Sequence, residues 1–266
     1  MIKFFRAIRQ KLIVENRLSK YLIYAIGEII LVVIGILIAI QVSNKNQSNQ
    51  QKVIERIYYE NLLNDLKDQK ASIKEQMKHE QEFYETSGYI IRDYEEDKTL
   101  ILDSVFFKNA ALIGSRRTFL ITDPTYTDLI SSGNIGLLHN ISFKNKLIKY
   151  YQALERIEKI IQNNNAFIVD QLYLDVYQRV GYDFYPDLPS VMGANIKLYP
   201  GMENPKYNTH LAAISKNLLS KEENLLEYMN AVNARNSVAI GHFNFLNRAN
   251  ETTTGLIKEL EEILQE

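Results

Sequence analysis

The residues that could perform chemistry are few and far apart in this sequence. There is no cysteine, which excludes thiolate nucleophiles, cysteine metal sites and disulfides. None of the four histidines has a Glu three residues before it, the spacing that helical bundles use to hold paired metal ions: His79, His139, His210 and His242. The short motifs of zinc proteases, serine hydrolases and nucleotide-binding loops are also missing. We therefore predict that the protein is not an enzyme, with no cofactor and no metal site.

One acidic run, Glu95 to Asp97, follows an apolar pair at Ile90 and Ile91. It lacks the spaced oxygen ligands of a calcium loop. We interpret it as the solvated end of a helix.

A single carboxylate lies inside the longest apolar stretch of the chain. On a helix with 100° per residue, Glu28 shares a face with Gly35 and Ala39, a small-xxx-small pair that lets a second helix approach closely. These three residues therefore form a candidate contact for self-association within a membrane. Two alternatives stay open: a polar residue tolerated near the inner interface, and an ion or proton pathway.

The apolar stretch itself is a predicted membrane span over residues 21–42. Its nineteen residues from Leu22 to Ile40 include one charged side chain. At about 1.5 Å per residue they cover roughly the 30 Å hydrocarbon core, which is longer than the apolar region of a cleaved signal peptide. At the end of the stretch, the pair of small residues two positions apart that a signal peptidase needs is missing, because Ala39 and Ser43 follow Leu37 and Gln41 at that distance. We therefore predict an anchor that is retained in the lipid bilayer.

Charge near the two ends of the span predicts its orientation. Residues 1–20 carry six Lys or Arg, whereas residues 41–60 carry three. Positive flanks stay in the cytoplasm. The expected location is a bacterial inner membrane, crossed once, with a cytoplasmic N-terminus and a periplasmic C-terminal domain. Segment 1–20 is basic and amphipathic, so it either lies on the anionic leaflet or serves only as the topology signal.

The region beyond the span is predicted to be all-α: a polar neck over 43–51, then an elongated antiparallel helical bundle over 52–266. Apolar residues at three- and four-residue spacing predict long helices from Val53 to about Asp97, from Ser142 to about Val180, and from Ser220 to the end. Short helices are expected from Asp103 or Ser104 to Leu112, over Pro124 to Ser132 with Asp123 as N-cap, and over Thr209 to Leu219. Gly133 suits the left-handed position after the second of these, and Asn140 can cap the helix that follows.

The spacing also predicts which residues face the core. On the first long helix the expected stripe is Tyr59, Leu63, Leu66, Ile73, Met77, Tyr84, Ile91 and Tyr94. On the last helix it is Met229, Val232, Asn236, Ala239, Phe243, Leu246, Asn250, Thr253, Ile257, Leu260 and Leu264. Asparagines at core positions cost stability and can fix the register between neighbouring helices.

Residues 181–208 hold four of the five prolines and are predicted to form a long loop. Its four tyrosines make it a candidate partner surface, because aromatic side chains contribute strongly to interfaces: Tyr182, Tyr185, Tyr199 and Tyr207. The alternative is that these rings cover the end of the bundle.

Two blocks of sequence carry a family resemblance. The first is IKFFRAIRQKLIVENRLSKYLIYAIGEIILVVIGILIAIQ, and the second is TYTDLISSGNIGLLHNISFKNKLIKYY, from Thr125 to Tyr151. Both are similar to an uncharacterised family of bacterial single-span membrane proteins, a domain of unknown function. The resemblance implies a helical extracytoplasmic region and no established activity. The chain departs from the family where a Trp often follows the span, since Ser43 to Asn46 contains none.

With a formal charge of −1, the chain is not predicted to bind nucleic acid. The leading hypothesis is a membrane-anchored periplasmic interaction or scaffold protein without catalytic activity, which self-associates through its span and binds another envelope protein. The alternative is an extracytoplasmic ligand-sensing domain that signals through a membrane partner. A third possibility is an enzyme acting on envelope material, which requires acids or histidines to converge in the fold.

Overall fold

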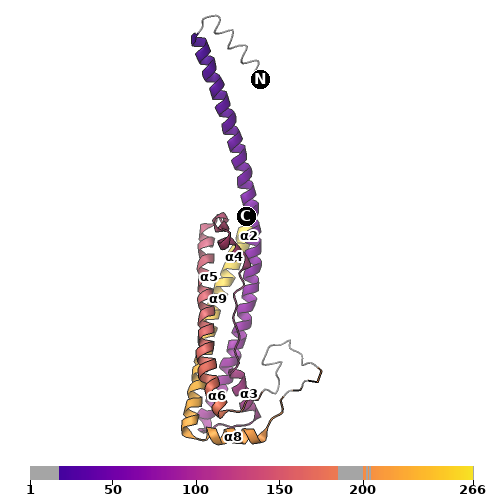
Figure 1. Cartoon of the computed structure of the whole chain (residues 1–266), viewed down its shortest axis with the longest axis vertical. Helices are drawn as coiled ribbons and strands as arrows, with labels where there is room; N and C mark the ends of the chain where they lie inside the picture. The colour runs from indigo at the N-terminus through magenta and orange to yellow at the C-terminus, as the bar shows by residue number, and fades with distance from the viewer. Residues whose placement is uncertain (1–17, 185–199, 202, 204, 266) are drawn as a thin grey trace. The chain divides into compact units, whose positions relative to one another are not determined.

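A computed structural model describes residues 18–184, 200–201, 203 and 205–265 (Figure 1). The described residues form helices and loops without strands, which confirms the all-α class. The chain divides into two compact units, residues 1–57 and 58–266. The predicted basic segment 1–20 lies almost entirely outside the described residues.

Helix α2 (Leu18–Asp97) supplies the whole described part of the first unit. It contains one segment, starting at Ala25, that is long and apolar enough to cross a membrane, and none of that apolar window is buried. The polar residues 43–51 are helical as well, and the helix ends at the predicted acidic run.

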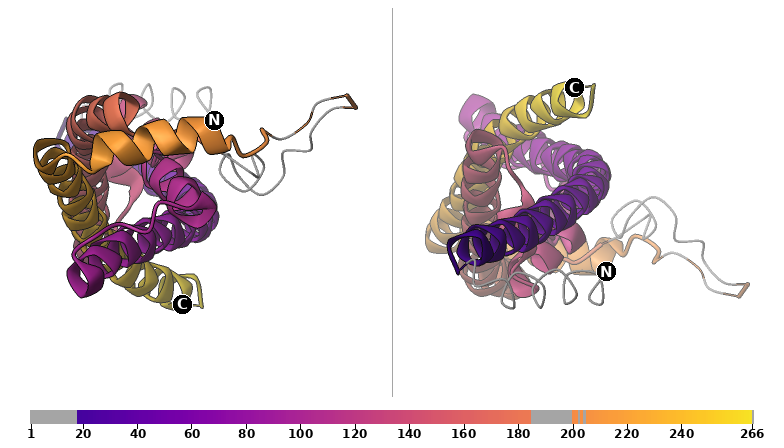
Figure 2. Two further views of the ribbon diagram at one scale, coloured as in Figure 1. Left: turned by 90° about the horizontal axis from the view of Figure 1, so that it is seen from below. Right: turned by 90° about the horizontal axis from the view of Figure 1, so that it is seen from above.

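The second unit is a bundle built on three long helical segments. These are the part of α2 from Tyr58 onward, α5 (Ile141–Asn164) and α9 (Glu222–Gln265), which lie side by side (Figures 1 and 2). Helix α8 (Thr209–Leu219) lies across one end. The remaining elements are α3 (Ser104–Ile113), α4 (Pro124–Ser131), the 3-10 helix η1 (Asn134–Leu137), the π-helix η2 (Asn165–Tyr173) and α6 (Leu174–Val180).

Local sequence explains where several helices begin and end. The Asp103 carboxylate accepts hydrogen bonds from the backbone amides of Val105 and Phe106 at 2.9 Å, and so caps α3. The Asn140 side chain accepts one from the Phe143 amide at 3.0 Å and caps α5. Gly133 has a φ of 75°, the left-handed conformation expected after α4. All three predictions are confirmed.

Two predicted start signals behave differently. The Asp123 side chain makes no cap hydrogen bond to α4; its carboxylate accepts one from the Thr127 hydroxyl. The Thr125 amide instead donates to Asp65 of α2 at 2.9 Å, so a neighbouring helix supplies the missing acceptor. The hydroxyl of Ser220 donates to the Asn217 carbonyl at the end of α8, and α9 begins two residues later.

The single helix predicted from Ser142 to about Val180 ends where expected but is not a regular α-helix throughout. Nine residues from Asn165 to Tyr173 adopt the π form between α5 and α6. The change begins at the run of asparagines 163–165. A π segment shifts the faces of a helix, so α5 and α6 present different stripes to the core.

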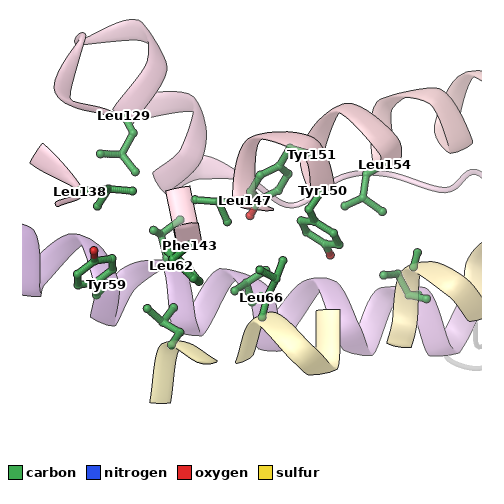
Figure 3. Packing of buried hydrophobic residues seen from close by; sticks show 14 of the residues in the cluster. Tyr59, Leu62, Leu66, Leu129, Leu138, Phe143, Leu147, Tyr150, Tyr151 and Leu154 are labelled. Atoms are coloured by element: carbon green, nitrogen blue, oxygen red, sulfur yellow. The ribbon is translucent and has the colours of Figure 1, made fainter. Parts of the chain in front are cut away.

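The bundle has two apolar core clusters. The first joins α2, α4, α5 and α9, and Figure 3 shows its α2 side chains facing those of α5. The rings of Tyr59 and Phe143 meet edge to face across this contact, with centroids 5.8 Å apart. The second cluster lies where α3, η2, α6 and α8 meet α2 and α9, and is rich in aromatic rings.

On α2 and α9, several buried residues are not the ones that the sequence predicted to face the core. On α2 the fully buried residues include Leu62, Gln76, Glu80, Phe83 and Ile90, whereas Leu63 and Met77 are only partly buried. On α9 they include Arg235, His242 and Leu256 in place of the expected Asn236, Phe243 and Ile257. The predictions followed apolarity, and polar residues occupy several of the true core positions.

Tyrosine hydroxyls are unusually common in this core. Burial raises the pKa of Tyr150 to about 12, although its 2.8 Å hydrogen bond with Thr253 acts in the opposite direction. Burial also raises the pKa of Tyr151 and of Tyr228 above the ordinary value. A group whose pKa is raised on folding gives its full stabilisation below its unfolded pKa, which is about 10 for tyrosine, and loses it as the pH rises toward the folded value.

We predict that the free energy of unfolding falls from pH 10 to pH 12, and that Tyr150→Phe reduces this fall by on the order of 2 kcal/mol. The check is denaturant unfolding of the detergent-solubilised chain, followed by circular dichroism across that pH range. Tyr89→Phe is the matched control, because Tyr89 is exposed, and it should keep the wild-type pH dependence. Equal slopes for Tyr150→Phe and wild type would contradict the prediction.

Candidate functional site

A layer of buried polar side chains is the most unusual feature of the bundle. It consists of Gln76 and Glu80 on α2, Arg235 and His242 on α9, and the partly buried Asn164 at the end of α5, and is called the polar layer below. The side chains of Glu80, Arg235 and His242 are exposed by only 2%, 1% and 0%. Charged groups are almost never so deeply buried without partners.

The layer separates the two core clusters along both helices. On α2, Ile73 belongs to the first cluster and Ile90 to the second, with Gln76 and Glu80 between them. Helix α9 shows the same arrangement in the opposite direction. Its buried polar residues Arg235 and His242 lie between Val232 of the second cluster and Leu246 of the first.

One oxygen of Glu80 satisfies two partners. Its Oε1 accepts a hydrogen bond from Gln76 Nε2 at 2.9 Å and lies 3.1 Å from His242 Nδ1. The other oxygen, Oε2, lies 3.8 Å from Arg235 Nη1, close enough for an ion pair but too long for a hydrogen bond. The carboxylate thus connects all the charged members of the layer.

Arg235 is held by groups on two other helices, α2 and α3. Its Nε donates to the Ile113 carbonyl at the end of α3 at 3.0 Å, and its guanidinium carbon lies 4.1 Å from the centre of the Phe83 ring. Burial lowers the pKa of Arg235, while the negative charge of Glu80 opposes that shift.

His242 connects the layer to the start of the π-helix. Its Nε2 lies 3.0 Å from Asn164 Nδ2, one residue before η2 begins. A neutral imidazole with its proton on Nδ1 satisfies both contacts, because it donates to Glu80 and accepts from the Asn164 amide. The irregular segment therefore begins beside the one buried histidine of the described chain.

A carboxylate hydrogen-bonded to an imidazole is the pair that many hydrolases use to move protons. Here the two groups are sealed inside the bundle and contact only protein atoms. The described residues contain no group of three or more acids and histidines that could hold a metal ion. What this geometry can do is fix the register of α2, α5 and α9, as buried polar groups do in several helical assemblies.

A second polar contact fixes the same register one turn away. The Asn236 amide donates to the Tyr84 carbonyl at 3.1 Å and to the Ser87 hydroxyl at 2.9 Å. Asn236 is thus a cross-helix link that can fix the register, although it is only partly buried and does not occupy the predicted core position. The side-chain oxygen of Asn250, the other predicted asparagine, is buried without a hydrogen bond.

The predicted membrane-contact residues all lie on the exposed segment of α2. Glu28 is partly exposed, and Gly35 and Ala39 are exposed. A Cβ added at Gly35 would meet no atom within 4 Å. The role of these residues as a helix contact stays a prediction.

The structure brings together two of the four tyrosines predicted as a partner surface. Tyr182 and Tyr207 lie against Phe107, with ring centroids at 5.5 and 6.4 Å, and against Phe184. The Tyr182 hydroxyl also accepts from the Asn208 amide at 2.9 Å. These rings cover the end of the bundle, in keeping with the alternative reading, and a partner contact there stays a prediction. Tyr185 and Tyr199 lie outside the described residues.

The polar layer itself was not predicted from the sequence. Glu80 reads as an interruption of an apolar stripe, and His242 and Arg235 lie beside Phe243 and Asn236, which fit the apolar stripe better. One signal was present. Arg235, Ala239, His242, Leu246 and Ala249 keep the three-four spacing, so two polar residues seven positions apart lie in register with core residues.

We predict that Glu80→Ala lowers the free energy of unfolding by about 3 to 5 kcal/mol, because it leaves a buried arginine without a counter-charge. The double variant Glu80→Gln with Arg235→Met should lose less than the sum of the two single variants, since neither buried charge remains. Denaturant unfolding of the full chain in detergent measures both. Glu85→Ala, on an exposed turn of the same helix, should cost less than about 0.5 kcal/mol. A Glu80→Ala variant as stable as Glu85→Ala would show that the ion pair contributes nothing.

Comparison with known proteins gives a family match for the chain. No curated protein and no solved structure matches the chain. The model of a "Family of unknown function (DUF6090)" matches residues 28–188, a range that begins in the apolar segment of α2 and extends past α6. This range holds both the Glu80 side of the polar layer and the Thr125 to Tyr151 block. Since it spans more than half of the sequence, the chain belongs to this family of unknown function.

Proposed function

We propose that this protein is a membrane-anchored helical interaction or scaffold protein without catalytic activity. In this proposal the span crosses a bacterial inner membrane once, with residues 1–20 in the cytoplasm and the bundle in the periplasm. The partners are the lipid bilayer, a second copy of the chain through the span, and an envelope protein bound by the bundle.

The observation that carries the proposal is the exposed apolar surface of α2. Large apolar side chains between Leu22 and Val42 are exposed by 46% at Val33 to 71% at Ile23. The apolar window has a mean hydropathy of 2.6. Leaving such surface in water costs about 25 cal/mol for each Å², and a bilayer removes that cost. Six positive charges before the span against three after it support the proposed orientation.

The absence of catalysis is supported by where the reactive groups lie. Glu80 and His242, the pair best suited to proton transfer, are closed off from solvent and from any substrate. Their contacts are those of a structural cross-link between helices. A non-enzymatic role is thus the simplest use of the described geometry.

Self-association through the span is supported by an open face of small residues. Gly35 and Ala39 lie on the same face of α2 as Glu28. The space beside Gly35 is empty, so a second helix can approach its backbone.

A second candidate function is ligand sensing, with the signal passed to a membrane partner. The observation that favours it is a groove between α5 and α9 with a cationic rim.

For topology, we predict that alkaline phosphatase fused after Glu266 is active and that a fluorescent protein at the same position is dark, because the C-terminal part is translocated. Replacing Lys3, Arg6, Arg9 and Lys11 by Glu should reduce phosphatase activity, since it leaves two positive charges before the span against three after it and so reverses the charge bias. Strong fluorescence with an inactive phosphatase in the unaltered chain would overturn the proposed orientation.

For self-association, we predict that Gly35→Leu lowers the signal in a membrane two-hybrid assay several-fold, since the larger side chain holds the helices apart. Glu28→Gln tests the polar contribution on the same face. Gly27→Leu is the matched control: it makes the same change about 80° away from Gly35 around the helix, and the space there is also open. Equal effects of the two glycine variants would exclude the proposed contact face.

A further inference from the structure

A groove runs between α5 and α9 on the surface of the bundle and has a volume of about 510 Å³. Its floor is apolar, made chiefly by Leu154, Ile157, Ile160, Phe245 and Ala249. This volume is within the range of small-molecule pockets, which is roughly 300 to 1,000 Å³. We refer to it as the α5–α9 groove.

The charged residues along the groove are all cations. Lys146, Lys149, Arg156 and Arg248 line it, and no Asp or Glu does. Lys146 is paired with Glu259 at 2.8 Å. For the other three, the described part of the chain provides no ion-pair partner, and Lys149, Arg156 and Arg248 are exposed. An apolar floor with unneutralised positive charge along its edge is complementary to a molecule with an apolar tail and an anionic head.

The polar groups on the floor are already used. The Tyr150 hydroxyl is hydrogen-bonded to Thr253 at 2.8 Å, and the Thr252 hydroxyl donates to the Arg248 carbonyl at 2.9 Å. A bound peptide backbone would therefore find few hydrogen-bond partners in the groove. A protein partner would also need about 800 Å² of surface on each side, whereas an acyl chain needs only the apolar floor.

A second groove on the same bundle serves as an internal comparison. It lies between α2 and α9, has a volume of about 420 Å³, and is lined by Gln81, Tyr84, Glu85, Ala239, Ile240, Phe243 and Asn244. Its floor is apolar too, but its one charged residue is an acid. An anionic amphiphile should avoid this groove, because the carboxylate would repel its head group.

We propose that the α5–α9 groove binds an anionic amphiphile with a single acyl chain in the groove, its carboxylate or phosphate held by Arg156, Arg248 and Lys149. A free fatty acid and an anionic membrane lipid share this chemistry. The inference goes beyond the scaffold role and does not depend on it, since the scaffold proposal needs no ligand. Charge-assisted hydrogen bonds to the anionic head supply specificity, and the apolar floor supplies affinity.

The test uses the full chain in nanodiscs of zwitterionic phosphatidylcholine. The probe is a twelve-carbon fatty acid with a photoreactive diazirine in its tail, and mass spectrometry locates the adducts. We expect adducts on α5 and α9 along the groove, displaced by dodecanoate but not by dodecanol or acetate. Mapping the adducts separates binding in the groove from partitioning of the probe into the bilayer.

Matched variants test the site itself. Ala153→Trp fills the groove from an exposed position and should abolish its adducts, whereas Ile240→Trp in the α2–α9 groove should leave them unchanged. Arg156→Glu with Arg248→Glu should weaken labelling about tenfold, and Lys159→Glu, an exposed change outside the groove lining, should not. Circular dichroism confirms that each variant is folded.

A further arm distinguishes the two sources of the amphiphile. If a membrane lipid is the ligand, nanodiscs doped with photoreactive phosphatidylglycerol should label the groove. If a free fatty acid is the ligand, only the fatty-acid probe should label it. Either result supports the site. Adducts spread evenly over the bundle, equal competition by dodecanol, or displacement by an acidic helical peptide but not by dodecanoate would overturn the proposal.

Discussion

The burial of Glu80 is the constraint that organises the bundle. A carboxylate at 2% exposure must find its charge and hydrogen-bond partners inside the protein, and it finds them on α9 and on its own helix. Those contacts are satisfied in only one register of α2 against α9. Because His242 also reaches Asn164, the same register extends to α5 at the point where that helix changes to the π form. The two apolar clusters pack on either side of the polar layer. The polar layer fixes the register of the helices, and the apolar clusters supply most of the stability.

Side chains from other helices also supply hydrogen-bond partners that the local sequence does not provide. Asp65 of α2 caps α4, and Gln69, one turn further along α2, accepts from the Thr122 amide at 2.6 Å. At the other end of the bundle, the Ser215 hydroxyl of α8 donates to the Val180 carbonyl where α6 ends. Short helices and an extended connection are thus held by side chains from the long helices. A fold built in this way leaves its long outer faces free, and the α5–α9 groove lies on one of them.

The elements of the fold were largely predictable, and the candidate site was not. The ends of α2, α3 and α8, the left-handed Gly133 and the Asn140 cap follow from local rules about capping and periodicity. The core positions were predicted correctly at several apolar residues, as at Leu66, Ile73 and Leu246, but not at Leu62, Phe83 or Leu256. They were missed at Glu80, Arg235 and His242, because a charged residue is assigned to the surface unless its partner is known, and the partners lie more than 150 residues apart in sequence.

The sequence by itself determined the helical class, the exposed apolar segment of α2 and most helix boundaries, because these depend on hydrophobic periodicity and on interactions between residues a few positions apart. Only the tertiary structure decided which face of each long helix is buried, which charges pair inside the core, and which cations are left without partners along the α5–α9 groove. Those outcomes depend on the relative rotation and register of α2, α5 and α9. A rotation of one position, about 100° around a helix, exchanges Phe243 for His242 at the core, and only the contacts between helices select one over the other.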